Sequence, residues 1–552
     1  MLTKRLVFTL CLLFITASLL RPYYIVLGSL GELSYVKITD YSPINATIKW
    51  LRRDLGRDLE SPPLVCDVNN DGSQEVIVAG RTVDNKCNVW AFDLETGSIV
   101  WHTILPEIPI LPALSTSDLN GDGFLDILVR TENKIFILNG SDGSVEFTLS
   151  TTAYSVAPFI DINNDGFREI VVAETHRLVV FSGLDGSVLW SFRLDGRFGA
   201  FAFADVDGNG LWEIIVAYDS NGSHPFTLPD TLLVFSSDGR LLRGINLGLK
   251  GGDYIISEPL IVDVNGDGLL DVVLSSIYNC LAVDLFSGRV LWRLNYLDCL
   301  DEVSRTYVTW TFGVFPSIGD INSDGELEIL IASRFLMFII SSDGELSYYA
   351  MLPESNFLYE GFGAIGDVDG DNRCEIVIGG ITTIWIFDWD DKRFYSIPIG
   401  WEQNAKPATL VDIDGDSDVD ILVAGQDRLY AFDLLSSGFR IDFPFPSING
   451  SYIGNYMLID PDLDGLSTYS EKLVGTDPYS YDSDGDGYND GYEVANNMNP
   501  LKFDERPPSP PPKSPISLYL QIATIVGVST IGLIVVIAYI RSKKKLSKHL
   551  MS

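Results

Sequence analysis

Short apolar stretches rich in Val, Ile and Leu recur between residues 45 and 445, and polar turns separate them. Within one unit, a short strand leads into a polar loop and then into a β-branched strand such as 169–174. A hairpin with an Asp-Gly or Thr-Gly turn follows. Several first strands open with proline, as at Pro259 and Pro316, where the missing N–H removes no ladder hydrogen bond. The pattern predicts units of four antiparallel strands, here called A to D in chain order.

The units repeat at intervals of 43 to 58 residues, measured between the first Asp of successive polar loops. Four-stranded units at this period are typical of propeller blades. The loop occurs eight times, so we predict an all-β fold, a β-propeller of eight blades, with seven blades as the alternative. The segment 48–58 reads as an outer strand without a blade of its own. We expect it to close the ring on the last blade, whose strands run from about 407 to 433.

The polar loop between strands A and B has a distinctive chemistry. In 263–273 an oxygen-bearing side chain stands at positions 1, 3, 5 and 9, and Gly268 stands at position 6. Crowded carboxylates repel one another unless a cation lies between them, and this spacing is that of a calcium loop. Position 12 is apolar in all eight copies, so position 9 must close the site, and a strand rather than a helix leaves the loop.

We therefore predict a calcium site in each loop. The predicted ligands are Asp67, Asn69, Asp71, Glu75, Asp118, Asn120, Asp122, Asp126, Asp161, Asn163, Asp165, Glu169, Asp205, Asp207, Asn209, Glu213, Asp263, Asn265, Asp267, Asp271, Asp320, Asn322, Asp324, Glu328, Asp367, Asp369, Asp371, Glu375, Asp412, Asp414, Asp416 and Asp420.

Two further acidic loops between 460 and 493 follow the twelve-residue pattern of a helix-flanked calcium loop, with a Glu at position 12. Their predicted ligands are Asp460, Asp462, Asp464, Glu471, Asp482, Asp484, Asp486 and Glu493. Together with the eight loops, they predict about ten calcium ions as the cofactors of this protein.

The stretches FGAFAFADVDGNG (198–210), TFGVFPSIGDINSDG (311–325) and GFGAIGDVDGDN (361–372) resemble FG-GAP repeats, the blades of integrin alpha-like propellers, and the related VCBS repeats. This resemblance covers 45–445 and implies calcium in the A–B turns and a ligand on the opposite face. Residues 456–504 resemble thrombospondin type 3-like and dockerin-like calcium repeats. A dockerin implies a cohesin partner, but the position beside a membrane segment favours a stalk.

The two ends of the chain predict a surface protein. Residues 1–28 read as a signal peptide or an N-terminal anchor, and 516–540 is an uncharged apolar stretch long enough for a transmembrane helix. A Pro-rich linker, 505–515, precedes this stretch, and the basic tail 541–552 follows it and favours a cytoplasmic C-terminus. We expect localisation in the cell membrane with the ectodomain outside. The net charge of −37 argues against a nucleic-acid partner.

Five cysteines lie between the signal segment and the membrane segment, which leaves one thiol over if the others pair. Cys66 with Cys87, and Cys280 with Cys299, are the possible pairs. Cys374 lies inside a calcium loop.

The connections between strands suggest where a ligand binds. Because antiparallel strands alternate in direction, the A–B and C–D turns share one face of the ring, and the B–C and D–A connections share the other. The long segments, among them 293–314 and 351–362, are all of the second kind. Trp310, Tyr359 and Trp401 lie in them and are the candidate ligand-binding residues, although they are also suited to plugging the channel.

The sequence favours a surface recognition or adhesion protein with a protein or glycan ligand, rather than an enzyme. No base-plus-nucleophile pattern is recognisable, and we name no catalytic residue. A polysaccharide lyase on a calcium propeller is the alternative function, and a passive surface scaffold is the third.

Overall fold

The computed structural model describes residues 46–443 with gaps, the two strands 24–27 and 34–37, and residues 476 and 500–502. The longer gaps are 220–229, 305–315, 353–362, 400–405 and 435–440. The predicted stalk loops, the linker, the apolar segment 516–540 and the tail lie outside the described residues. Within the described part, no helix is long and apolar enough to span a bilayer.

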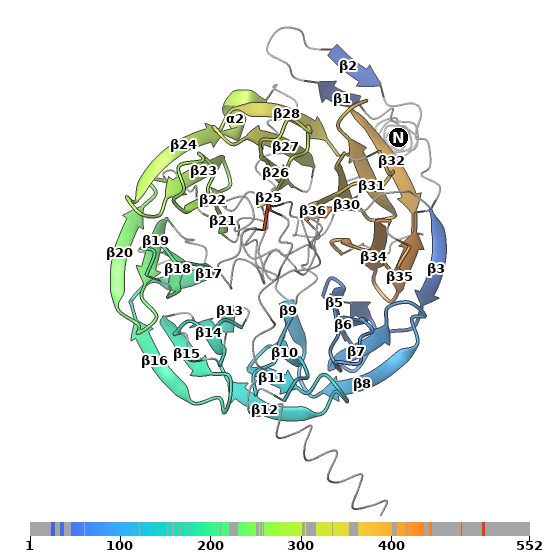
Figure 1. Ribbon diagram of the computed structural model, residues 1–552, viewed down its shortest axis with the longest axis vertical. Helices are drawn as coiled ribbons and strands as arrows, with labels where there is room; N and C mark the ends of the chain where they lie inside the picture. Colours follow the sequence, from blue (N-terminus) through green and yellow to red (C-terminus); the bar gives the residue numbers. More distant parts are fainter. Residues whose placement is uncertain are drawn as a thin grey trace, which may run out of the picture.

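Eight antiparallel sheets surround a central axis, which confirms the prediction of an eight-bladed propeller (Figure 1). The first four blades are β5 (Leu64–Cys66), β6 (Glu75–Arg81), β7 (Cys87–Asp93) and β8 (Ile99–Leu105); β9 (Pro109–Ser117), β10 (Asp126–Thr131), β11 (Lys134–Leu138) and β12 (Val145–Ser150); β13 (Ala153–Val156), β14 (Glu169–Glu174), β15 (Arg177–Ser182) and β16 (Val188–Arg193); and β17 (Arg197–Ala204), β18 (Glu213–Asp219), β19 (Thr231–Phe235) and β20 (Leu241–Asn246).

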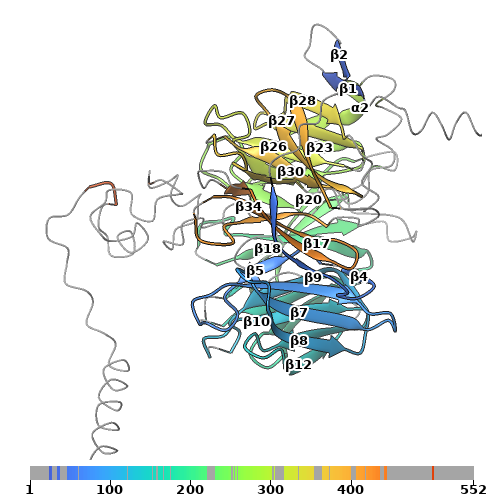
Figure 2. The same ribbon diagram turned by 90° about the vertical axis from the view of Figure 1, so that its right-hand side faces the viewer.

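The next three blades are β21 (Leu260–Val262), β22 (Asp271–Ser275), β23 (Asn279–Asp284) and β24 (Arg289–Asn295); β25 (Pro316–Gly319), β26 (Glu328–Ala332), β27 (Leu336–Ser341) and β28 (Leu346–Met351); and β29 (Gly363–Gly366), β30 (Glu375–Gly379), β31 (Thr383–Asp388) and β32 (Arg393–Pro398). A short helix, α2 (Tyr296–Cys299), follows the fifth blade. Figure 2 shows the blades edge-on, and the hairpin of β1 (Tyr24–Leu27) and β2 (Ser34–Lys37) lies outside them.

The eighth blade joins the two ends of the propeller. It contains β33 (Thr409–Val411), β34 (Asp420–Ala424) and β35 (Leu429–Asp433), and its outer strand is β3 (Thr47–Arg52) from the start of the chain. β3 pairs antiparallel with β35, with Thr47 opposite Asp433 and Arg52 opposite Leu429. This pairing confirms the predicted closure of the ring. Two short strands, β4 (Asp58–Leu59) and β36 (Ile441–Phe443), add to the first and seventh blades.

The hydrophobic core lies between the blades. Strands B and C, such as β10 and β11, are buried along almost their whole length because neighbouring blades cover both of their faces. The outer strands are more exposed, and in β16 none of the six residues is fully buried. The apolar runs of strands B and C therefore reflect packing from both sides.

Tryptophans on four of the outer strands, β3, β8, β16 and β24, contact a turn of the next blade. The indole Nε1 of Trp190 donates a hydrogen bond to the carbonyl of Ser237, 2.8 Å away in the turn of the following blade. That turn has Gly239 at φ 83°, and a Cβ there would lie 2.7 Å from the Trp190 ring. Trp50, Trp101 and Trp292 donate in the same way to Leu94, Gly140 and Ser342. Glycine is required at these turns both for φ and for the close approach.

The suggested disulfides are absent, since all five described cysteines have free thiols. The sheet order explains why Cys66 and Cys87 do not form a disulfide. β6 lies between the strands of Cys66 and Cys87, and these two residues pair with opposite ends of β6, at Glu75 and Arg81.

Candidate metal centres

The same hydrogen bond fixes the closing acid in every one of the eight loops. The acid at position 9 is the first residue of strand B and is buried, with at most 4% of its surface exposed. Its carboxylate accepts a hydrogen bond from the backbone N–H of position 2. The eight donor–acceptor pairs, at 2.9 to 3.1 Å, are Val68 to Glu75, Leu119 to Asp126, Ile162 to Glu169, Val206 to Glu213, Val264 to Asp271, Ile321 to Glu328, Val368 to Glu375 and Ile413 to Asp420.

The side chains at positions 1, 3 and 5 turn back over the loop. In the fifth loop Asp263 accepts hydrogen bonds from the backbone of Asp267 and Gly268 at 3.2 and 2.8 Å, and Asn265 accepts one from Asp267 at 2.9 Å. Gly266 and Gly268 have φ values of 71° and 83° with open space where a Cβ would stand, so backbone conformation selects glycine there. Asp263 and Asp267 lie close enough to the closing acid Asp271 for their charges to raise its pKa.

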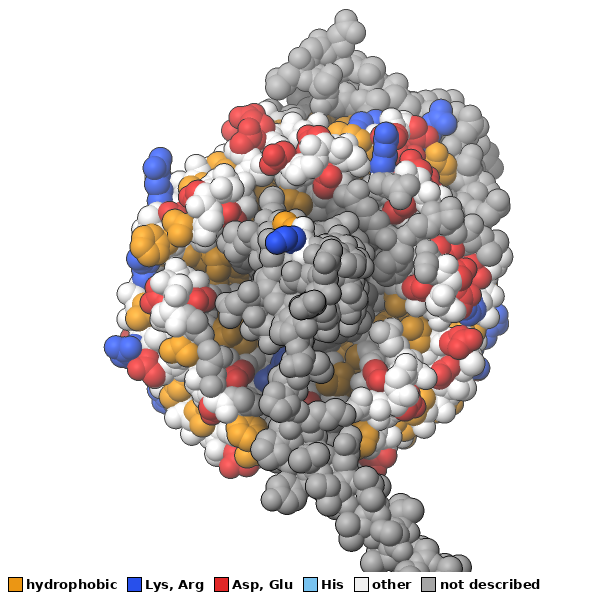
Figure 3. Space-filling view, viewed as in Figure 1, with side chains coloured by type: hydrophobic (Ala, Val, Ile, Leu, Met, Phe, Trp, Pro, Cys, Tyr) orange, Lys and Arg blue, Asp and Glu red, His pale blue; other side chains and the backbone are white. Residues whose placement is uncertain are grey.

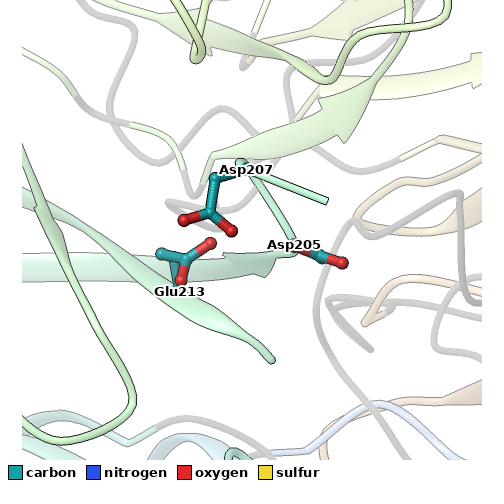
Figure 4. Close-up of side chains that lie close together, drawn as sticks. All are labelled: Asp205, Asp207 and Glu213. Atoms are coloured by element: carbon teal, nitrogen blue, oxygen red, sulfur yellow. The ribbon is translucent and has the colours of Figure 1, made fainter. Parts of the chain in front are cut away.

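In three places the loop carboxylates converge within the described residues. Asp205, Asp207 and Glu213 in the fourth loop each offer an oxygen atom within 4.8 Å of the others, and Figure 4 shows the carboxylates of Asp207 and Glu213 facing each other. The same holds for the acids of the seventh and eighth loops, which are Asp367, Asp369 and Asp371, and Asp412, Asp414 and Asp420. In the remaining loops position 3 is an Asn, which contributes an amide oxygen in place of a carboxylate.

Two of the closing acids have a buried oxygen without a partner. Oδ1 of Asp126 and Oδ1 of Asp271 make no hydrogen bond within the described structure, although their Oδ2 atoms are bonded to the loop. Unsatisfied buried carboxylate oxygens are costly, and a cation bound to such an oxygen removes the cost. The loops therefore fit a hard cation that takes oxygen ligands.

The raised pKa values of the closing acids also fit a bound cation. Burial raises the pKa of Glu75, Asp126, Glu169, Asp271, Glu328 and Asp420 to about 7 and that of Glu375 to about 9, and it raises the pKa of Glu213 as well. Neighbouring loop acids add to the rise through repulsion. Acidic side chains are also spread around the ring on the face seen in Figure 3.

The structure places all thirty-two propeller-loop residues predicted from the sequence in these eight loops. The stalk residues Asp460, Asp462, Asp464, Glu471, Asp482, Asp484, Asp486 and Glu493 lie outside the described residues, as do Trp310, Tyr359 and Trp401. Asp418 and Asp433 also lie among the acids of the eighth loop, but they were not among the ligands predicted from the sequence. The sequence feature that could have indicated Asp418 is its carboxylate at position 7, where the other loops have Ser, Phe, Leu, Glu or Arg.

A comparison with protein families matches the first part of the propeller. A family profile described as FG-GAP-like repeat matches residues 67–129, 118–172, 161–216 and 205–274. No curated protein matches the chain.

Three solved structures similar to this chain have low sequence identity to it. BamB from Moraxella catarrhalis is 12% identical with a TM-score of 0.45, over 70% of this chain and 97% of that one. The V. cholerae biofilm matrix protein Bap1 is 13% identical with a TM-score of 0.39, over 75% and 96%. Saccharomyces cerevisiae Sqt1 is 13% identical with a TM-score of 0.49, over 71% and 99%. Values this low say nothing about what this chain binds.

Fold and loops together define the class: an eight-bladed β-propeller, in which residues 67–274 match FG-GAP-like repeats. Acidic clusters in these repeats are consistent with calcium sites.

Proposed function

We propose that this protein is a calcium-stabilised, membrane-anchored propeller that recognises a protein or glycan ligand outside the cell. Calcium would be held in each loop by the side chains at positions 1, 3, 5 and 9. The bound ion supplies positive charge to carboxylates that otherwise repel, and so stabilises the A–B turns. The unpartnered Oδ1 atoms of Asp126 and Asp271 support this part of the proposal.

The observation that carries the recognition proposal is the unequal length of the connections on the two faces. The A–B loops are uniform, with eight residues between β21 and β22 and eight between β25 and β26. The connections from strand D to the next strand A vary, with two or three residues after β8, β12 and β16. Two later ones are long: β24 ends at Asn295 and β25 begins at Pro316, and β28 ends at Met351 and β29 begins at Gly363. Long loops on a rigid scaffold are common sites of binding, so the ligand face is the one opposite the calcium loops.

The contacts of two histidines favour recognition over a lyase. His102 stacks on Trp90 with ring centroids 3.5 Å apart, and His176 bonds the backbone carbonyl of Gly196 at 2.8 Å. Both rings are held in structural contacts, so neither is placed as a free general base. Tyr296, an aromatic residue at the start of a long connection, is buried, and its hydroxyl lies 2.8 Å from that of Ser275. Tyr296 therefore belongs to the core, and we do not include it among the proposed ligand-binding residues.

A binding screen tests the proposed function. The purified chain is tested against glycan and protein panels with calcium and after chelation, and in parallel against acidic polysaccharides for unsaturated products. Recognition predicts a specific ligand and no turnover. Unsaturated products would establish the lyase, and no ligand in either assay would favour a passive scaffold.

Alanine substitutions of Trp310, Tyr359 and Trp401 then locate the ligand site. Each is expected to weaken binding by about 1–2 kcal/mol if it is an anchor. Thermal melting of the same variants is the control, because loss of a core aromatic lowers stability clearly whereas loss of a surface contact does not. Normal binding by all three variants, together with loss of binding on substitution of the calcium face, would contradict the assignment of the face.

A further inference from the structure

The eighth blade has a second group of carboxylates beside its loop. Asp418, Asp420 and Asp433 each offer an oxygen within 4.8 Å of the others. Asp420 begins β34, Asp433 ends β35, and Asp418 stands two residues before β34. Asp420 also belongs to the loop group with Asp412 and Asp414. The two groups therefore share one carboxylate.

Asp418 is the observation that points to a ligand. Only 2% of the residue is exposed, and within the described structure neither carboxylate oxygen has a hydrogen-bond partner. Its backbone N–H is satisfied by Oδ1 of Asp416 at 3.3 Å, so the side chain alone lacks a partner. A buried carboxylate without a donor is strongly unfavourable unless a cation binds it or a proton neutralises it.

The two oxygens of Asp420 are engaged from opposite sides. Oδ2 accepts from the loop N–H of Ile413 at 3.0 Å, and Oδ1 accepts from the N–H of Leu434, beside Asp433, at 3.2 Å. In the first and fifth blades the N–H that corresponds to Leu434 donates to a backbone carbonyl instead, from Leu94 to Gln74 and from Leu285 to Leu270. Only in the eighth blade, among these three, does the closing acid reach toward the end of strand C.

The fifth blade has an acid at the end of strand C but no acid at position 7 of its loop. Asp284 ends strand C of the fifth blade as Asp433 does in the eighth, but its Oδ1 accepts from the N–H groups of its own turn, Phe286 at 2.8 Å and Ser287 at 3.0 Å. Position 7 of that loop is Leu269. An Asp at position 7 together with an acid at the end of strand C occurs only in the eighth blade.

Charge also favours more than one cation here. Six carboxylates belong to this loop and the end of its strand C, and they are Asp412, Asp414, Asp416, Asp418, Asp420 and Asp433. Asp414 pairs with Lys49, whose Nζ lies 2.5 Å from Oδ2. These six carboxylates and Lys49 together carry five negative charges, so one divalent ion leaves three, whereas two ions leave one.

We propose that the eighth blade binds two divalent cations, one in its loop and a second among Asp418, Asp420 and Asp433, with Asp420 shared between them. All ligands are carboxylates, so the second ion is a hard cation, and calcium is the probe. Asp433 lies opposite Thr47 of the closing strand β3, so the second ion sits at the seam of the ring. This inference goes beyond the loop sites proposed above, because it depends on Asp418 and Asp433, which are not ligands of those sites.

Native mass spectrometry of the purified full-length chain in calcium tests the proposal by counting bound ions. Asp418→Ser, which introduces the residue of the first loop at this position, and Asp433→Asn are each expected to lose one ion relative to the unaltered chain. Asp412→Asn, in the loop site, is expected to lose one ion, and Asp420→Asn two. Asp284→Asn is the matched control at the end of strand C and is expected to lose none.

The outcomes separate this proposal from the loop sites. An unchanged ion count in both Asp418→Ser and Asp433→Asn, with circular dichroism showing a folded protein, would overturn the second site and would mean that Asp418 is neutralised by a proton. Loss of one ion in Asp418→Ser with no loss in Asp412→Asn would support the second site while contradicting the loop. If Asp418→Ser does not fold, Asp433→Asn decides alone, because its side chain is less buried.

Discussion

At the scale of single residues, the acid at position 9 has the same structural role in all eight loops. It begins strand B, accepts the N–H of position 2, and is nearly inaccessible to solvent, as Asp126 and Asp271 show. The sequence indicated this role because position 12 is apolar, which left position 9 to close the loop. It did not indicate that one carboxylate oxygen of Asp126 and one of Asp271 remain without a partner, because that depends on how the strands pack.

Replacing a closing acid should have opposite effects with and without calcium. In Asp126→Asn the neutral amide removes a buried charge, so the calcium-free protein should be as stable as the unaltered chain or more so. The stabilisation by calcium should fall by about 2.7 kcal/mol if calcium is present at one hundred times its dissociation constant. Denaturant unfolding with and without calcium measures both.

Asp142→Asn is the control, since Asp142 lies in the C–D turn of the same blade and bonds the N–H of Ser144 at 2.8 Å. Equal effects of the two substitutions on calcium stabilisation would contradict a ligand role for Asp126.

The raised pKa values predict how the calcium-free protein responds to pH. The pKa of Glu75, Asp126 and Asp271 is about 7 in the folded protein, above the ordinary carboxyl range near 4 in the unfolded chain. Between these values the folded state binds more protons, so the contribution of these groups to stability is present below pH 4 and is lost as pH rises through 7. Thermal melting of metal-free protein should therefore show lower stability at pH 7.5 than at pH 5.

Calcium should reverse this trend, because it binds the ionised carboxylates. A calcium-loaded protein whose melting temperature also falls between pH 5 and pH 7.5 by the same amount would be inconsistent with ion binding at these groups.

At the scale of elements, the contact between an outer strand and the next turn sets the spacing of the blades. Trp190 on β16 donates to Ser237 and packs on Gly239 of the following blade. The Thr-Gly and Asp-Gly hairpins were recognisable in the sequence as turns. These turns also pack against a tryptophan of the preceding blade. The sequence could not show this contact, because it joins residues about fifty positions apart in neighbouring sheets.

Gly239→Ala should therefore be more destabilising than its backbone conformation alone explains. A Cβ at φ 83° would also lie 2.7 Å from the Trp190 ring, which adds about 1–3 kcal/mol to the cost of the left-handed conformation. Gly248→Ala is the control, at φ 65° with its nearest atom 3.9 Å away. Unfolding free energies measure the difference, and equal losses in the two variants would show that the contact with Trp190 is unimportant.

At the scale of the whole molecule, ring closure ties the two ends of the propeller together. Lys49 of β3 contacts Asp414 in the loop of the eighth blade, and β3 completes that blade. Blade number, closure and loop positions were predictable because each depends on a local repeat. The second carboxylate group of the eighth blade was not, since Asp418 and Asp433 lie fifteen residues apart and meet only when β34 and β35 pair.

Deleting residues 45–56 should open the ring and expose the edge of β35, and exposed strand edges promote aggregation. Light scattering after size-exclusion chromatography measures association, and thermal melting measures the loss of stability. A deletion variant that stays monomeric and melts like the unaltered chain would contradict closure as a source of stability.

We propose that calcium is part of this fold. Its most direct test is the calcium content of the purified chain, measured by elemental analysis, together with its thermal melting before and after chelation. We expect about ten bound ions per chain and a large fall in melting temperature on chelation, which added calcium reverses. Purified protein that contains no calcium, with a melting temperature unaffected by chelator, would contradict the account.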